Sequence, residues 1–122
     1  MSIEAEFRKP TDEEQALLNR LLEADFPGRD ELALLFGEVL VKTIDDDGCL
    51  GLRSEVEGSA PVVQRVPVEA EGKDQDGIVV HMLLHTVEGR PVELEFYRDD
   101  GATVRQMPSA SAFELIVLPP MP

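Results

Sequence analysis

The fold is decided by one stretch in the second half of the chain, Ile78-Val-Val-His-Met-Leu-Leu-His-Thr-Val87. Its β-branched and apolar residues are typical of a β-strand. Because side chains alternate along a strand, both faces of this one receive apolar residues. A strand that is apolar on both faces belongs in the middle of a sheet, so the sequence predicts a central strand with a neighbour on either side.

Short turns on both sides of this strand define the rest of the sheet. Asp76-Gly77 and Glu88-Gly89 flank it, and similar turns occur at Asp47-Gly48 and Asp100-Gly101. Such turns join antiparallel neighbours. The runs between them predict strands at 39–45, 49–56, 62–71, 78–87 and 91–98, and a last edge strand from Phe113 to Leu118.

Two helices are expected before the strands. Thr11 and Glu14 form a capping box, in which each side chain accepts a hydrogen bond from the backbone N–H of the other residue. Leucines then recur at helical spacing. The second helix is predicted from Asp30, its N-cap, to Phe36, with Gly37 ending it in the left-handed conformation.

The expected fold class is therefore α+β, in a single domain over residues 1–122. The chain is too short for a second hydrophobic core. Two N-terminal helices, at about 11–37, are predicted to pack on one face of a five- or six-stranded antiparallel meander sheet, at about 38–118.

The composition limits the possible partners. Asp and Glu total 25 against 11 Lys and Arg, a net charge of −14. Binding to nucleic acid or to an anionic membrane needs a basic patch, so neither is expected. The lone cysteine, Cys49, cannot form an intrachain disulfide and indicates a reducing, cytoplasmic location. The N-terminus is acidic and has no apolar run, so no signal peptide is predicted.

The turns also fix which residues face each other across the central strand. Three-residue loops with a left-handed glycine are predicted on either side of it, at Gln75-Asp76-Gly77 and Val87-Glu88-Gly89. A one-residue change of register would place Glu or His in the core, because it flips every side chain. With these loops the core face pairs Ala70 with Met82, Val68 with Leu84, Met82 with Leu94 and Val80 with Phe96.

The same register gathers charged residues on the opposite face of the sheet, where opposed Cβ atoms lie about 5 Å apart. The predicted neighbours are His81 between Glu71 and Glu95, Leu83 between Glu69 and Glu93, and His85 between Pro67 and Pro91. We call this surface the acidic face, and define it by Glu69, Glu71, His81, Leu83, Glu93, Glu95 and Tyr97.

Four interpretations of the acidic face are open. It is a solvated sheet surface, a docking surface for a basic partner, a metal site of His81, Glu71 and Glu95, or a carboxylate–histidine acid/base site. The solvated surface is favoured, followed by docking, because cross-strand charge pairing is an ordinary stabilising device. Carboxylates spread over three flat strands fit a closed metal shell poorly, since ligand oxygens must approach one ion to ~2 Å.

Other candidate motifs lack the context that their chemistry needs. His81 and His85 have the spacing of a zinc-binding helix, but on a strand they lie about 13 Å apart. The acidic turn before Gly48 lacks the rest of a calcium loop, and no serine has a nucleophile-elbow sequence. No catalytic residue, metal ligand or cofactor is therefore predicted, and the protein is not expected to be an enzyme.

A further pattern is spread over turns and strands at Arg65-Val-Pro-Val-Glu-Ala-Glu-Gly-Lys-Asp-Gln-Asp-Gly77, Val80-His-Met-Leu-Leu-His85, Gly89, Glu93-Leu-Glu-Phe-Tyr-Arg98 and Asp100-Gly101. In this pattern the chain resembles an uncharacterised family of short bacterial proteins, a domain of unknown function. The resemblance covers roughly residues 10–108. It implies a capped N-terminal helix, the sheet in the same order and a bacterial intracellular origin, and it implies no activity.

The sequence thus predicts a small, acidic, non-catalytic binding or regulatory protein that uses the acidic face. The expected partner is a basic protein, and an immunity protein against a basic toxin is one form of this function. A metal-dependent enzyme is the alternative from a different class. The sequence does not distinguish a monomer from a dimer.

Overall fold

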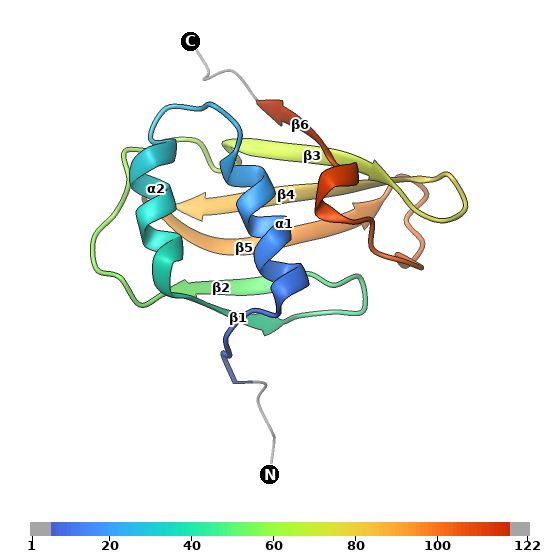
Figure 1. Cartoon of the computed structure of the whole chain (residues 1–122), viewed down its shortest axis with the longest axis horizontal. Helices are drawn as coiled ribbons and strands as arrows, with labels where there is room; N and C mark the ends of the chain where they lie inside the picture. Colours follow the sequence, from blue (N-terminus) through green and yellow to red (C-terminus); the bar gives the residue numbers. More distant parts are fainter. Residues whose placement is uncertain (1–5, 118–122) are drawn as a thin grey trace.

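The structure of the protein is a computed structural model, which describes residues 6–117. Helices and strands are shown in Figure 1. In chain order the elements are α1 (Asp12–Leu22), α2 (Arg29–Leu35), the 3₁₀-helix η1 (Phe36–Glu38), β1 (Val39–Thr43), β2 (Leu50–Ser54), β3 (Val68–Lys73), β4 (Val79–Val87), β5 (Arg90–Arg98), the 3₁₀-helix η2 (Ala110–Ala112) and β6 (Glu114–Val117).

The six strands form one antiparallel sheet in the order β1-β2-β5-β4-β3-β6. The predicted α+β class, the antiparallel sheet and the inner position of β4 are confirmed. The predicted meander is wrong for the sheet as a whole, because β2 pairs with β5 and β6 returns to pair with β3. Segment 55–67 carries the chain from β2 past β5 and β4, which is too long a path for a hairpin turn.

The third strand begins at Val68, whereas residues 62–71 were predicted to form it. The segment before it crosses the end of β4 instead. There the backbone N–H of Thr86 donates to the Arg65 carbonyl at 2.8 Å, and its hydroxyl donates to the Gln64 carbonyl at 2.7 Å. Pro67 has no N–H for a ladder hydrogen bond, which favours a strand start after it.

The last predicted strand, Phe113 to Leu118, is confirmed as β6 over Glu114–Val117, at the edge of the sheet beside β3. Its predicted final residue, Leu118, lies outside the described residues.

The two helices begin differently. The capping box of α1 is confirmed, because the N–H of Glu14 donates to Thr11 Oγ1 at 3.1 Å and the N–H of Thr11 donates to Glu14 Oε1 at 2.9 Å. In α2 the predicted cap is wrong: Gly28, at φ 86°, precedes the helix, and Asp30 lies in its first turn. A Cβ on Gly28 would stand 2.7 Å from Val62 Cγ2, so the loop packed there favours glycine.

The end of α2 also differs from the prediction. Gly37 does not have a positive φ and does not end the helix in the left-handed conformation. The helix tightens instead into η1, and the chain passes directly from this 3₁₀ turn into β1. Short 3₁₀ turns are common at helix ends because they satisfy the last free carbonyl groups.

The hydrophobic core joins the helices to the sheet. Figure 1 shows α1 and α2 in front of the strands. Buried helix leucines and inward strand side chains belong to one cluster, whose members include Leu17, Leu18, Leu21, Leu32, Leu35, Val68, Ala70, Met82, Leu84, Leu94, Phe96 and Phe113. Because strand side chains alternate, the intervening residues of β3, β4 and β5 point to the opposite face.

The turn between β3 and β4 has the predicted register. Ala70 lies opposite Met82, Val68 lies opposite Leu84, and Gly77 has φ 86°. The N–H of Asp74 also donates to the Ile78 carbonyl at 2.9 Å, which closes the predicted three-residue loop.

The turn between β4 and β5 differs from the predicted three-residue loop. Val87 pairs with Arg90, so the turn has only Glu88 and Gly89 between them, at φ 51° and 75°. Two central residues of positive φ are typical of a type I′ hairpin turn.

A β-bulge in β5 follows this shorter turn and corrects the register. Thr86 pairs with Pro91 and His85 pairs with Glu93, so Val92 is left without a partner on β4. The extra residue turns the remainder of β5 back to the correct face. As a result Met82 lies opposite Phe96, and Leu84 opposite Leu94, two residues away from the predicted pairs but still in the core.

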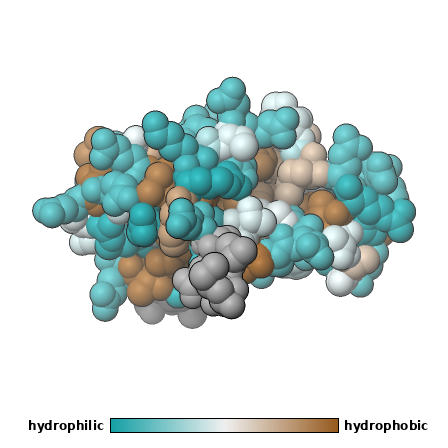
Figure 2. Space-filling model, turned by 90° about the horizontal axis from the view of Figure 1, so that it is seen from below, coloured by the Kyte–Doolittle hydropathy of each residue, from teal (hydrophilic) through white to brown (hydrophobic). Residues whose placement is uncertain are grey.

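The molecular surface is mostly hydrophilic when it is viewed from below, toward the β1 edge (Figure 2). Among residues 6–117, the exposed large hydrophobic residues come from different elements and connections: Leu34 of α2, Ile44 after β1, Val63 before β3, Val87 of β4, Tyr97 of β5 and Val117 of β6. Apolar residues scattered in this way are normal on a folded domain and identify no apolar interface. The features that distinguish this surface are its polar and charged side chains.

Candidate functional site

The acidic face forms on β3, β4 and β5, on the side opposite the buried residues. Its neighbours across β3 and β4 are as predicted, with Glu69 opposite Leu83 and Glu71 opposite His81. The predicted neighbours across β4 and β5 are wrong, because the two-residue turn and the bulge at Val92 each move them by one residue. The observed pairs are His81 with Tyr97, Leu83 with Glu95 and His85 with Glu93.

His81 is enclosed by an aromatic ring and two carboxylates. Its ring stacks on Tyr97 with centroids 4.5 Å apart and planes inclined by 16°. Nε2 contacts Asp99, and Nδ1 lies 3.8 Å from Glu71 Oε1. The two carboxylates therefore approach different nitrogens of the ring. A metal ion bound to either nitrogen of His81 would have only one of these carboxylates beside it. The metal site of His81, Glu71 and Glu95, one of the four interpretations, is not brought together, because Glu95 lies against His85 instead.

Tyr97 reports the electrostatic character of this surface. Burial raises the pKa of the Tyr97 hydroxyl, and the nearby charges of Glu69, Glu95, Asp99 and Glu71 raise it further. Each of these carboxylates repels the negative charge that the Tyr97 hydroxyl would carry as a phenolate. The acidic face thus presents a negative potential around a ring that is 40% exposed.

His85, which was predicted between two prolines, is the better placed of the two histidines for binding chemistry. Its Nε2 lies 2.7 Å from Glu95 Oε1, and Arg65 Nε donates to its Nδ1 at 3.2 Å. Donor atoms of His85, Glu93 and Glu95 all lie within 4.8 Å of one another. The sequence analysis missed this cluster because it depends on the bulge, which leaves only a weak signal in the sequence.

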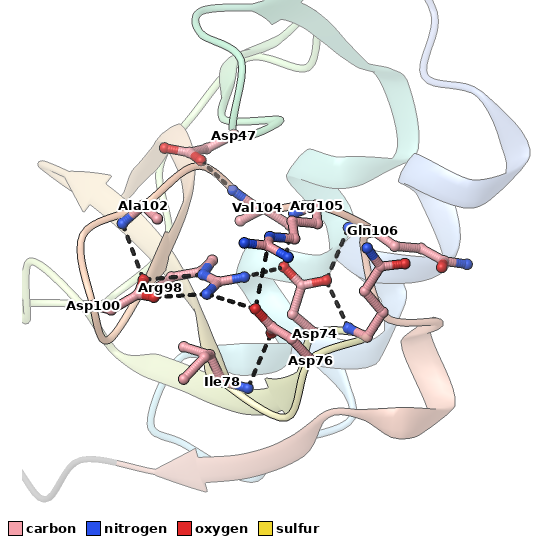
Figure 3. Close-up of polar contacts among 11 residues, drawn as sticks. Asp47, Asp74, Asp76, Ile78, Arg98, Asp100, Ala102, Val104, Arg105 and Gln106 are labelled. Carbon is pink, nitrogen blue, oxygen red and sulfur yellow. Dashed lines mark hydrogen bonds and ion pairs between the residues drawn. The ribbon is translucent and has the colours of Figure 1, made fainter.

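A second charged cluster lies at the end of β5, on the core side of the sheet (Figure 3). Arg98 and Asp74 are only 3% and 4% exposed. The Arg98 guanidinium reaches three carboxylates, of Asp74 at 2.9 Å, Asp76 at 2.9 Å and Asp100 at 2.7 Å. We call these four residues the Arg98 cluster.

The Arg98 cluster holds irregular chain segments in place. Asp74 accepts hydrogen bonds from the backbone N–H groups of Gln75 at 2.7 Å, Arg105 at 2.7 Å and Gln106 at 2.9 Å. The carboxylate of Asp100 accepts the N–H of Ala102 at 3.0 Å. Side chains therefore bind N–H groups that no helix or sheet satisfies in this segment.

A structural role follows from how fully the Arg98 cluster is satisfied. Among the described residues, no buried side-chain nitrogen or oxygen lacks a hydrogen-bond partner. The signal for this cluster was present in the sequence. Because Leu94 and Phe96 face the core, strand alternation also turns Arg98 inward, and a buried arginine requires acidic partners.

The electrostatics of the Arg98 cluster favour its ionised carboxylates. Burial alone would raise the pKa of Asp74, but its three backbone N–H donors and the Arg98 guanidinium outweigh burial and hold that pKa far below the usual range. The Arg98 hydrogen bond lowers the pKa of Asp100 to about 2 and also lowers the pKa of Asp76. The carboxylates in turn raise the pKa of Arg98.

These shifts predict the acid stability of the protein. An aspartate in the unfolded chain has a pKa of about 3.9, so the unfolded state takes up protons at a higher pH than this cluster does. The stability from Asp74, Asp76 and Asp100 is present above about pH 4 and is lost as pH falls toward about 2. Urea unfolding followed by circular dichroism at several pH values should show this loss.

The matched variants for this experiment are Asp100→Asn and Asp25→Asn, since Asp25 is exposed and lies outside the cluster. Asp100→Asn should be less stable at pH 7 and should lose less stability between pH 4 and 2 than the wild type does. A pH profile for Asp100→Asn that runs parallel to the wild-type profile would contradict the argument.

The acidic turn before Gly48 is also occupied by backbone contacts. Asp45 Oδ1 accepts the N–H groups of Asp47 at 2.9 Å and Cys49 at 3.2 Å. Asp47 Oδ1 accepts the N–H of Val104 at 2.8 Å, which ties this turn to the loop after β5. These hydrogen bonds show that Asp45 and Asp47 stabilise the turn and its contact with the loop after β5.

The lone cysteine has the environment of an inert thiol. Cys49 is 4% exposed, its Sγ donates to the Phe96 carbonyl at 3.3 Å, and the Phe96 N–H donates to the sulfur at 3.1 Å. Burial raises the pKa of the thiol to about 12, and nearby Asp45 and Glu93 add to this effect. A thiol in this state is a poor nucleophile.

Comparison with known proteins identifies the family of this chain. The family model described as a domain of unknown function, DUF6984, matches residues 7–108. The chain belongs to this family. The chain matches no curated protein and no solved structure. Membership in DUF6984 confirms the predicted resemblance to an uncharacterised family, and it assigns no activity to either cluster.

The match to DUF6984 spans the parts of the chain that build both clusters. Residues 7–108 include α1, strands β1 to β5 and the segment that donates to Asp74. The match ends before β6. No helix within residues 6–117 is both long and apolar enough to cross a membrane.

Proposed function

We propose that this protein is a non-catalytic binding protein whose acidic face docks a basic segment of a partner protein. The observation that carries the proposal is the arrangement around Leu83. Glu69 and Glu95 stand directly opposite this half-buried leucine on either side, and Glu71 and Glu93 lie in the adjacent positions. An apolar centre with an acidic rim fits a segment in which basic and apolar residues alternate.

The net charge of −14 supports the same kind of partner. A negative field attracts a basic segment over a distance and raises its rate of association, especially at low salt. Leu83 and Tyr97 would then supply apolar contact once the segment has docked. We also propose a cytoplasmic location, which the lone buried Cys49 supports. A bacterial source is proposed as well, because the chain resembles short bacterial proteins.

The proposal is tested with a defined peptide of alternating Arg and Leu. Nitrogen-15 NMR titration should move the amide signals of β3, β4 and β5 on the acidic face, and a peptide of alternating Glu and Leu should not. Reversing Glu69, Glu71, Glu93 and Glu95 to Lys should weaken binding about tenfold or more and reduce its dependence on salt.

A matched control separates the acidic face from overall charge. Asp25, Glu31, Glu38 and Glu57 are exposed acids outside the acidic face, and their reversal to Lys changes the net charge by the same amount. This control should retain most of the binding. Equal loss in both variants, or shifts spread over the whole molecule, would show charge attraction without a docking surface and would refute the proposal.

A further inference from the structure

We propose that His85, Glu93 and Glu95 form a binding site for a divalent transition-metal ion. This inference does not rest on partner docking, because it concerns the cluster and a metal ion alone. The donor atoms lie within 4.8 Å of one another, on two adjacent strands. All three side chains are partly buried, and that of His85 is only 16% exposed.

The backbone explains why these residues meet. His85 pairs directly with Glu93 across β4 and β5. Glu95 lies two residues further along β5 and therefore projects on the same face. Donor atoms that bind one ion at about 2.1 Å are themselves about 3 Å apart. His85 Nε2 and Glu95 Oε1 are already 2.7 Å apart. The donor atom of Glu93 lies within 4.8 Å of the donor atoms of the other two residues, so the Glu93 carboxylate completes the set by moving toward them.

The donor set selects the class of ion. Two carboxylates carry the charge that a divalent cation neutralises, and an imidazole favours Zn²⁺, Cu²⁺, Fe²⁺ or Ni²⁺ over Mg²⁺ and Ca²⁺. Three protein ligands leave at least one coordination position for water.

Arg65 regulates this site through the second nitrogen of His85. Because Arg65 Nε donates to Nδ1, the ring carries its proton on Nε2, where it bonds to Glu95. A metal ion on Nε2 requires that proton to move, through water, to Nδ1, so Arg65 must withdraw. Arg65 is exposed and can do so. Removing Arg65 should therefore tighten metal binding, both by freeing Nδ1 and by removing a positive charge.

His81 provides an internal control on the same face. It also lies among carboxylates, but Glu71 and Asp99 approach its two different nitrogens. The chain contains two histidines, so their imidazole signals form a simple nitrogen-15 NMR spectrum. The variants His81→Ala and His85→Ala assign these signals, and tag-free protein avoids added histidines.

The experiment titrates Zn²⁺ alone, with Mg²⁺ alone for comparison, by calorimetry and by imidazole NMR. One Zn²⁺ per chain should bind and shift the Nε2 signal of His85 while the ring of His81 keeps its signals. His85→Ala and Glu95→Gln should weaken Zn²⁺ binding about tenfold or more. His81→Ala and Glu71→Gln should leave it within about twofold, and Arg65→Ala should strengthen it.

Several results would overturn the site. They are the absence of Zn²⁺ binding at millimolar concentration, equal losses in the His81 and His85 variants, and a Zn²⁺ affinity that Glu95→Gln leaves unchanged. The stoichiometry and the shift of one imidazole ring out of two are measured on the wild type. Either His81→Ala or His85→Ala alone suffices to assign that ring, so the test holds even if one of these substitutions disturbs folding. The docking proposal is measured without metal, and its outcome does not affect this result.

Discussion

Gly89→Ala should lower the free energy of unfolding by roughly 2–5 kcal/mol. Gly89 has φ 75°, which costs a residue with a side chain about 1–2 kcal/mol. A Cβ at this position would also overlap the carbonyl oxygen of Ala60, and its distance to the Ala60 nitrogen would be 3.0 Å. The Ala60 N–H donates to the Gly89 carbonyl at 2.9 Å, so a shift of either segment strains this bond as well.

Gly77→Ala is the matched control for this prediction. Gly77 has φ 86°, but a Cβ there would meet no atom within 4 Å. It should cost only the backbone part of the penalty, about 1–2 kcal/mol. Urea unfolding followed by circular dichroism measures both variants, since the chain has no tryptophan. Equal destabilisation by the two substitutions would show that the contact with Ala60 contributes nothing.

Arg98→Leu is expected to lower the melting temperature by an amount on the order of 10 °C or more at pH 7. It removes the cation that Asp74, Asp76 and Asp100 share and leaves their carboxylates close together, one of them fully buried. Breaking a buried ion pair from one side is costly because the remaining charge has no partner. Arg98→Lys should recover only part of the loss, since an ammonium group lacks the planar geometry that reaches three carboxylates.

Arg105→Ala controls for the removal of any arginine near this cluster. Its side chain is 59% exposed and lies 3.7 Å from Asp76, so its loss should change the melting temperature little. The difference in melting temperature between Arg98→Leu and the wild type should also become smaller at pH 3, because carboxylates begin to be protonated there and repel each other less. A melting temperature for Arg98→Leu close to that of Arg105→Ala would contradict the structural role of the Arg98 cluster.

Much of this fold could be predicted from local signals in the sequence. The capping box at Thr11 is such a signal, and so are the apolar residues on both faces of β4, which identified an inner strand. The strand order could not be predicted, because the pairing of β2 with β5 depends on the path of segment 55–67, which has no regular pattern. The start of α2 was missed because Gly28 is selected by contact with Val62, far along the chain.

The composition of the acidic face was predictable, but its internal contacts were only partly so. The alternation of side chains along each strand was enough to place Glu69, Glu71 and His81 on one side of the sheet. The neighbours across β4 and β5 required the turn length and the bulge together, because a two-residue turn with a bulge gives the same core face as a three-residue turn without one. Alternation thus predicted which face each residue occupies and left its partners open.

The unpaired Val92 links the length of the hairpin to the chemistry of both sheet faces. With the same turn and no extra residue, Glu93 and Glu95 would stand opposite Leu84 and Met82, inside the core. No single side-chain substitution could repair such a change, because it would reverse the whole strand. Insertions and deletions between His85 and Glu93 should therefore be tolerated only in compensating pairs, so that this hairpin evolves in length by coordinated steps.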